Sequence, residues 1–197
     1  MLSIKNNIVN EFVIKKSRFI TILFRVDNVD DVNKYLDDLS IKYKDATHIC
    51  YAYIIDNIKR FSDNGEPGGT AGMPILSVLE NKNLNHVLCC VVRYFGGVKL
   101  GANGLVRAYS GSCNEAIDCS SVVELIPGCL CNIIFNYDDT KTVDSLLINS
   151  NIVSKKYYDK VSYDFKIDSS CLDGIKSELI KYCELKIIDN CYIEKDI

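Results

Sequence analysis

The sequence predicts an α+β protein with two domains, residues 1–124 and residues 125–197. Strand-like and helix-like apolar patterns alternate along the whole chain. Pro127 and Gly128 interrupt these patterns, and eight of the eleven glycines lie between residues 62 and 109, on one side of the interruption. A chain of 197 residues, of which 48% are hydrophobic, is long enough to form one or two packed cores.

The first domain is expected to contain four strands and three helices. Runs of β-branched and other apolar residues predict strands over residues 8–15, 18–26, 47–55 and 86–95. Apolar residues that recur every three or four positions predict helices over residues 28–43, 73–83 and 103–119, the first of them capped by Asp27 or Asn28. The strands at 47–55 and 86–95 are apolar on both faces, so we expect them to be buried neighbours. Gly111, inside the third helix, suggests close packing at that point.

The second domain is expected to have the βαββαβ order of a ferredoxin-like fold. Residues 125–128, Leu-Ile-Pro-Gly, are predicted to form the hinge that leads into it. The patterns then predict a strand, a helix, two strands, a helix and a strand, over residues 129–136, 139–149, 151–158, 161–167, 170–182 and 185–194.

Two glycine-rich loops of the first domain are the expected functional site. The first covers residues 62–72 and the second residues 93–109, and each leads directly into a predicted helix. Glycine permits backbone conformations and close approaches that a Cβ forbids, and free N–H groups at a helix start attract anions. Such loops are often only tight connections, but the first is longer than a connection requires. The two buried strands should bring both loops to one end of the sheet.

The charge distribution points to a local anion-binding surface. Residues 1–120 carry 14 basic and 13 acidic side chains, whereas residues 121–197 carry 9 basic and 13 acidic ones. All five arginines lie in the first part, and arginine is suited to bidentate contacts with phosphate or carboxylate. The overall charge of −3 excludes a wholly basic nucleic-acid-binding protein, but it permits a basic patch on the first domain.

The ten cysteines and the chain start indicate a cytoplasmic protein. Several cysteines fall inside apolar runs, as Cys89 and Cys90 do, which is typical of reduced, buried thiols. No Cys-x-x-Cys pair is present, so we expect no metal site, and no cofactor-binding motif is present, so we expect no cofactor. No apolar segment is long enough to span a membrane, and residues 1–7 lack the apolar run of a secretory signal.

Three segments of the first domain carry motifs that occur together and in order. They are residues 45–53 (Asp-Ala-Thr-His-Ile-Cys-Tyr-Ala-Tyr), the loop at 62–72, and residues 92–101 (Val-Arg-Tyr-Phe-Gly-Gly-Val-Lys-Leu-Gly). Together with Lys-Ser-Arg-Phe-Ile at residues 16–20, they resemble the signature of the IMPACT family, in its bacterial YigZ-type branch. The resemblance extends over the whole chain, because a ferredoxin-like tail is typical of the bacterial members.

The resemblance implies a fold and a functional context. It implies that residues 1–120 have the α/β fold of the second domain of a small-subunit ribosomal protein, a fold that elongation factor G also uses. It implies that the tail resembles the last domain of the same factor. Larger eukaryotic members carry an extra N-terminal domain and are linked to control of translation initiation. We expect no counterpart of that domain here, so the eukaryotic mechanism is not expected to apply intact.

The loops contain no common catalytic or nucleotide-binding motif. Gly96 and Gly101 have the spacing of a Walker A loop, but Ala102 and Asn103 stand where Lys and Ser or Thr are needed. Dinucleotide-binding and serine-nucleophile motifs are also missing. The side chains that could act as general acid and base are those of His48, Asp63 and Glu66. Each has a structural alternative, as a hydrogen-bonded core histidine or as turn-forming and capping acids.

Two hypotheses follow. The favoured one is a non-catalytic, translation-associated protein whose loops bind RNA or the ribosome, or a translation-regulatory protein. The loop glycines, with Arg93, Lys99 and Arg107, would hold phosphate, and Tyr94 could stack on a base, whereas Phe95 and Tyr109 are better explained as core residues. The alternative is an enzyme acting on a small phosphorylated or carboxylated substrate through His48, Asp63 and Glu66. The expected ligand contacts are glycine, polar and charged residues of both loops: Asp63, Gly65, Glu66, Gly68, Gly69, Thr70, Arg93, Tyr94, Gly96, Gly97, Lys99, Gly101, Asn103 and Arg107.

Overall fold

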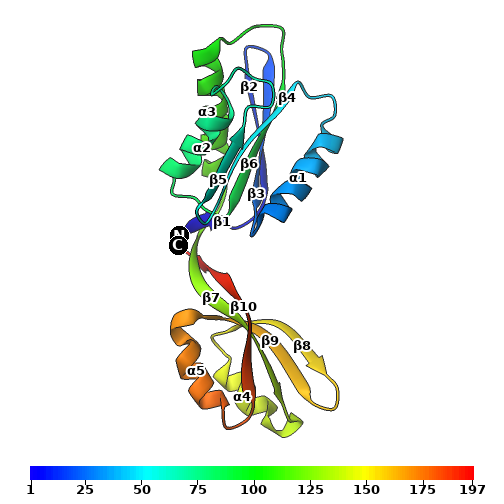
Figure 1. Cartoon of the computed structure of the whole chain (residues 1–197), viewed down its shortest axis with the longest axis vertical. Helices are drawn as coiled ribbons and strands as arrows, with labels where there is room; N and C mark the ends of the chain where they lie inside the picture. The colour runs from blue at the N-terminus through cyan, green and yellow to red at the C-terminus, as the bar shows by residue number, and fades with distance from the viewer. The chain divides into compact units, whose positions relative to one another are not determined.

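The computed structural model describes all 197 residues and shows a mixed α/β chain with two compact units (Figure 1). The first unit comprises Met1–Glu124 together with Asp196–Ile197, and the second comprises Leu125–Lys195. The last two residues belong to the first unit, where the Lys5 ammonium lies 2.6 Å from the Asp196 carboxylate.

The first unit is built on a five-stranded antiparallel sheet. Its strands lie in the order β2 (Ile8–Ile14), β3 (Ser17–Arg25), β6 (Val87–Tyr94), β4 (His48–Ile55) and β5 (Ile58–Ser62). β6 is central, and all its residues except Tyr94 are buried, as a strand that is apolar on both faces requires. β4 and β6 pair directly, with His48 opposite Arg93, so the predicted adjacency of these two strands is confirmed.

Helices cover both faces of this sheet. α1 (Val29–Lys42) lies on one face, and α2 (Gly72–Asn81) and α3 (Ala102–Asp118) lie on the other (Figure 1). Asn28 caps α1 in a capping box with Asp31, which confirms one of the two predicted caps. The apolar stripe predicted for the third helix is buried throughout: Leu105, Ala108, Tyr109, Cys113, Ala116 and Ile117.

Two strands of the first unit were not predicted. β1 (Leu2–Ile4) pairs with the first residues of β7 (Val122–Phe135), and β5 forms a hairpin with β4. β5 carries little apolar signal because four of its five residues are exposed. It is nevertheless essential to the site, because it turns the chain back along β4. The first glycine-rich loop therefore starts beside Tyr51, near the Arg93 end of β6.

The second unit contains the six elements predicted for it. They are β7, α4 (Thr140–Leu146), β8 (Asn151–Tyr157), β9 (Val161–Asp168), α5 (Leu172–Leu179) and β10 (Glu184–Asp196), with single 3₁₀ turns at Tyr137–Asp139 and Ser169–Cys171. β7 pairs with β9 on one edge and with β10 on the other, and β8 lies beyond β9. Alternate residues of β9 are buried, so this sheet packs its core on one face.

Residues 125–128, predicted as a hinge, lie inside β7, and the boundary between the two units falls directly before them. Leu125 is almost completely buried. The register of β7 with β1 ends at Glu124, and its register with β9 begins at Gly128. Pro127, which has no N–H to donate, falls between these two registers and so does not interrupt either of them.

The cysteines are all free thiols, and six of the ten are buried. Cys89 and Cys90 lie in the centre of β6 on opposite faces of the sheet, in the two separate cores. Burial raises the pKa of the Cys50 thiol, also in a central strand, to about 12. These thiols act as small apolar side chains. No helix is both long and apolar enough to cross a membrane.

Gly111 provides a test of the packing of α3. The expectation of close packing there is wrong, because a Cβ at this position would have no neighbour within 4 Å. Gly111→Ala should therefore raise the free energy of unfolding by about 0.5–1 kcal/mol, since alanine costs less chain entropy in a helix. Urea unfolding of both proteins measures the change. Gly96→Ala is the contrasting variant, because its Cβ would lie 2.0 Å from the Lys16 carbonyl carbon, and it should be destabilising.

Candidate functional site

The first glycine-rich loop is organised by the side chain of Asp63. Its carboxylate accepts three backbone hydrogen bonds, from the N–H groups of Gly69 (2.8 Å), Ala71 (2.9 Å) and Gly72 (2.8 Å). Two of these donors lie at the start of α2, where we expected a bound anion. Asp63 thus supplies a carboxylate of the chain itself at that helix start.

The hydrogen bonds to Asp63 also set its protonation. Partial burial alone would raise the pKa of this carboxyl, but the three N–H donors more than offset it, and the pKa is lowered from its usual value. A carboxylate held in the ionised form by backbone donors stabilises a loop. It is poorly suited to accept a proton from a substrate.

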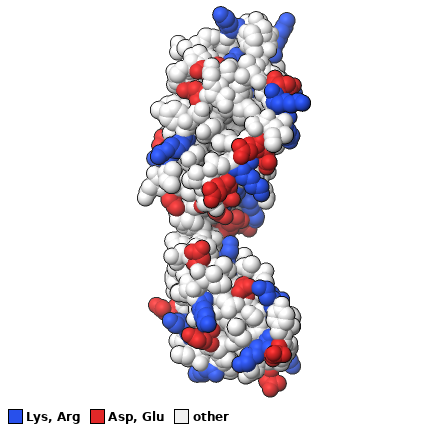
Figure 2. Space-filling model, turned by 45° about the vertical axis from the view of Figure 1, so that its right-hand side comes forward, with Lys and Arg blue, Asp and Glu red and all other residues white.

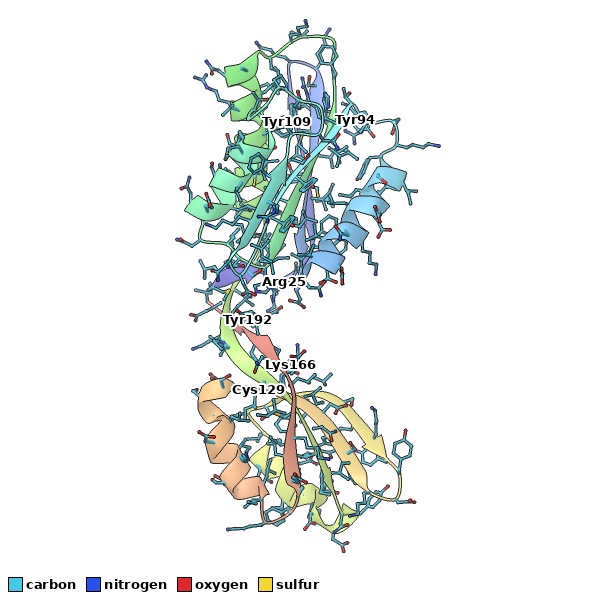
Figure 3. All side chains as sticks on the ribbon, viewed as in Figure 1. Arg25, Tyr94, Tyr109, Cys129, Lys166 and Tyr192 are labelled. Atoms are coloured by element: carbon cyan, nitrogen blue, oxygen red, sulfur yellow. The ribbon has the colours of Figure 1, made fainter.

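Glu66 forms a buried ion pair with Arg93. One Glu66 oxygen, Oε1, lies 2.5 Å from Arg93 Nη1 and also accepts a hydrogen bond from the Tyr109 hydroxyl at 2.8 Å. The side chains of Glu66 and Arg93 are only 3% and 6% exposed. Burial raises the pKa of Tyr109, so this hydroxyl remains a hydrogen-bond donor. The contact joins the first loop, the end of β6 and the middle of α3, at the end of the unit where Figure 3 labels Tyr109 and Tyr94.

His48 lies beside this pair but is engaged by the loop backbone. Its Nδ1 is 2.8 Å from the carbonyl oxygen of Asn64, an atom that can only accept, so Nδ1 carries the proton and donates. Its Nε2 is 3.9 Å from Glu66 Oε2, which is too far for a hydrogen bond. Gly65 packs on the ring, and a Cβ there would come within 3.2 Å of Nδ1.

The structure therefore brings His48, Asp63 and Glu66 together but gives each a partner within the chain. Asp63 caps its own loop, Glu66 neutralises Arg93, and His48 donates to the loop backbone. Thr70 is buried, with its hydroxyl donating to the Pro67 carbonyl at 2.7 Å. A groove of about 460 Å³ lies at the opposite end of β4, beside Ile54 and Asp56, and none of the expected site residues lines it.

Arg93 does not lie where the sequence placed it. It was expected to hold phosphate at the surface, but β6 directs it into the core above the Phe19 ring, where only 5% of the residue is exposed. The expectation that Phe95 belongs to the core is also wrong, because this residue is 45% exposed. Tyr109 is in the core, as expected. Tyr94 is half-buried and donates its hydroxyl to Asp45.

The second loop is hydrogen-bonded to neighbouring segments of the chain at its first residues and is exposed to solvent after them. The Phe95 N–H donates to the Thr47 hydroxyl (3.0 Å), and the Gly96 N–H donates to the Ser17 hydroxyl (3.2 Å). The Cα of Gly96 packs directly on the backbone of Lys16, which leaves no room for a side chain. Beyond this contact the remaining expected binding residues are exposed: Gly97, Lys99, Gly101, Asn103 and Arg107.

Lys99 and Arg107 are the basic side chains of this loop that remain available to a ligand. Both are exposed, and neither forms an ion pair within the chain. Gly101, whose φ of +72° favours glycine, precedes α3, and no side chain caps the start of this helix. In the first loop, Gly68 and Gly69 are likewise exposed. The available cations and uncapped N–H groups thus lie on the second loop.

The motifs that form this end of the unit are those of a known family. The model of the Impact N-terminal domain matches residues 15–117, just over half of the chain. The chain belongs to the IMPACT family. The match includes both glycine-rich loops, the buried Glu66–Arg93 pair and the turn between β2 and β3.

Curated IMPACT family members confirm the YigZ-type resemblance. The chain is 45% identical over 118 residues to YvyE of Bacillus subtilis, covering 58% of this chain and 54% of that protein. It is 42% identical over 109 residues to YigZ of Escherichia coli, covering 53% of each. The matched part thus spans about half the length of these two relatives. A Haemophilus influenzae member is 32% identical over 182 residues, 89% of this chain and 88% of that protein.

A solved structure is similar over both units. The crystal structure of a hypothetical protein aligns with 95% of this chain and 97% of its own, at a TM-score of 0.69 and 28% sequence identity. The two-unit architecture is therefore shared with another chain of similar extent.

The Glu66–Arg93 pair yields a stability prediction. Glu66→Gln leaves the Arg93 guanidinium buried without a counter-charge, so the free energy of unfolding should fall by about 3 kcal/mol. The double variant Glu66→Leu/Arg93→Met should reduce the free energy of unfolding by less than Glu66→Gln does, because it removes both buried charges. Glu80→Gln, in the exposed Lys59–Glu80 pair, is the control and should cost under about 1 kcal/mol. Equal losses for Glu66→Gln and Glu80→Gln in urea unfolding contradict the internal role of the pair.

The Asp63 contacts predict a dependence on pH. Because its pKa is lowered on folding, the stabilisation is present above the unfolded value of about 3.9 and disappears as the carboxyl is protonated. Asp63→Ala should therefore reduce the free energy of unfolding most near pH 7. The difference in free energy of unfolding between wild type and variant should become smaller below about pH 4. Urea unfolding at several pH values measures the gap, and an equal gap at pH 7 and pH 3 contradicts the prediction.

Proposed function

We propose that this chain is a non-catalytic, translation-associated protein that binds RNA through the second glycine-rich loop of its first unit. The observation that carries the proposal is the division of charged groups between the two loops. The acids of the first loop are bound by partners within the chain, whereas Lys99 and Arg107 of the second loop are exposed without an ion pair. A surface that presents unpaired cations fits a phosphate-bearing partner.

The uncapped start of α3 and exposed Phe95 support RNA as that partner. Backbone N–H groups at a helix start can contact phosphate oxygens, and an exposed aromatic ring can stack on an unpaired base. Such contacts are typical of looped or single-stranded RNA, including the exposed loops of the ribosome. The family resemblance, which links larger eukaryotic members to control of translation initiation, agrees with this context and with a cytoplasmic location.

Finer fold assignments agree with the same proposal. We assign the second unit to the ferredoxin-like class, an assignment that its βαββαβ order and the strand order β10-β7-β9-β8 support. We assign the first unit to the fold of the second domain of a small-subunit ribosomal protein, on the basis of the resemblance. The resemblance links both folds to elongation factor G.

The enzyme alternative has less support. It requires His48, Asp63 and Glu66 to face a substrate, but Asp63 and Glu66 are bound by loop N–H groups and by Arg93. Nε2 of His48 has no hydrogen bond to Glu66, and the His48 side chain is 20% exposed. A single available imidazole nitrogen does not define a reaction class.

The salt dependence of RNA binding tests the proposal. On single-stranded RNA each phosphate contact contributes about 0.7 to the slope of log affinity against log salt concentration. Lys99→Ala should therefore reduce the magnitude of the slope by about 0.7 and leave the fold intact, because the side chain is exposed. Fluorescence anisotropy of a labelled RNA over a range of salt concentrations measures the slope.

Lys181→Ala is the matched control, since it removes one exposed lysine of the second unit, and it should leave the slope unchanged. Absence of any salt-sensitive RNA binding by the wild-type protein contradicts the proposal. Loss of turnover of a small phosphorylated substrate in Lys99→Ala would favour the enzyme alternative.

A further inference from the structure

The turn between β2 and β3 has an unusual sequence for its conformation. Ile14 pairs with Ser17, so the hairpin loop consists of Lys15 and Lys16 alone. Both have positive φ angles, +46° and +67°, as a type I′ turn requires. Asn-Gly or Gly-Gly is the preferred pair in such turns, because a Cβ disfavours the left-handed region. Two lysines at these positions make the turn less stable than it could be.

The turn and the second glycine-rich loop form one surface. A Cβ on Gly96 would lie 2.0 Å from the carbonyl carbon of Lys16 and 2.4 Å from the nitrogen of Ser17. The Gly96 N–H also donates to the Ser17 hydroxyl. The backbone of Lys16 is therefore packed directly against the loop that carries Phe95 and Lys99.

The basic side chains of this surface have no acidic partners. Lys15 and Lys16 are exposed without an ion pair, as are Lys99 and Arg107. Arg18, by contrast, pairs with Glu11 through two hydrogen bonds of 2.6 and 2.7 Å. Figure 2 shows Lys and Arg side chains projecting at the upper end of this unit, where the turn and the loop lie in Figure 1.

We propose that Lys15 and Lys16 are phosphate-binding residues, which together with Lys99 and Arg107 form a site for single-stranded or looped RNA. This inference rests on the proposed function and adds a second segment to its site. Strained backbone in a folded protein is often retained for function, and here the strained residues are the ones that carry the charge. Exposed Phe95, beside Gly96, offers an aromatic ring on which an unpaired base can stack.

The double variant Lys15→Asn/Lys16→Gly separates the functional role from the structural one. It installs the preferred type I′ pair, so the melting temperature should rise by about 2–4 °C. With four cations on phosphates, the wild-type salt slope should be about −2.8, and removal of two should bring it to about −1.4. At about 0.1 M salt this corresponds to roughly 25-fold weaker binding of a labelled single-stranded oligouridylate.

Two control variants complete the test. Lys15→Arg/Lys16→Arg keeps both charges and should keep the wild-type slope. Lys34→Gln/Lys181→Gln removes two exposed lysines elsewhere, which matches the change in net charge, and it should also leave the slope unchanged. If Lys15→Asn/Lys16→Gly lowers the melting temperature instead, Lys15→Gln/Lys16→Gln provides the same loss of charge with less change in the turn.

The outcomes distinguish this inference from the proposed function. If Lys99→Ala reduces the salt slope but the turn variants do not, the inference is overturned and the proposed function stays intact. An absence of salt-sensitive RNA binding in the wild type overturns both. Binding to phosphatidylserine vesicles in place of RNA, lost in the turn variants, would assign the surface to a membrane and also overturn the inference.

Discussion

The buried ion pair between Glu66 and Arg93 is the contact on which the functional end of the first unit depends. Glu66 comes from the first glycine-rich loop and Arg93 from the end of the central strand, and Tyr109 joins them from α3. Two opposite charges removed from water are stable only next to each other, so the loop has to close over the strand end. That closure positions the Asp63 turn, the ring of His48 and the start of α2 around it.

This internal use of charge determines which groups remain for function. The acidic side chains of the first loop and the nearby arginine stabilise the conformation of that loop. The first loop thereby supports the second glycine-rich loop. The second loop and the β2–β3 turn keep their cations exposed, and Gly96 joins them through a backbone contact. The proposed anion-binding surface is therefore built from other residues than the buried pair, although both lie within the matched IMPACT segment.

The sequence was sufficient for the elements that carry a strong periodic signal. The long apolar runs of β4 and β6 predict two buried strands and the stripe of α3 predicts an amphipathic helix, and the structure contains all three. β5 is exposed and short, so its position depends on pairing with β4 and not on its own pattern. The burial of Arg93 could not be predicted for a similar reason. Arginine before a glycine-rich loop suggests a surface residue, and only the strand register places it opposite His48, within reach of Glu66.

Lys15 and Lys16 show why composition alone also missed part of the proposed site. A Lys-Lys pair between two strands is an ordinary sign of a solvated turn, and its meaning changes only when both φ angles are positive and Gly96 rests on the turn. That contact fixes the turn relative to the loop, so a ligand that binds both does not have to order them. A ligand binds more tightly when the binding segments are already ordered in the free protein, because binding then costs less conformational entropy. The strained turn and Gly96 beside it thus act together. In the proposed site they keep the lysines of the β2–β3 turn next to the cations of the second glycine-rich loop, which is far away in the sequence.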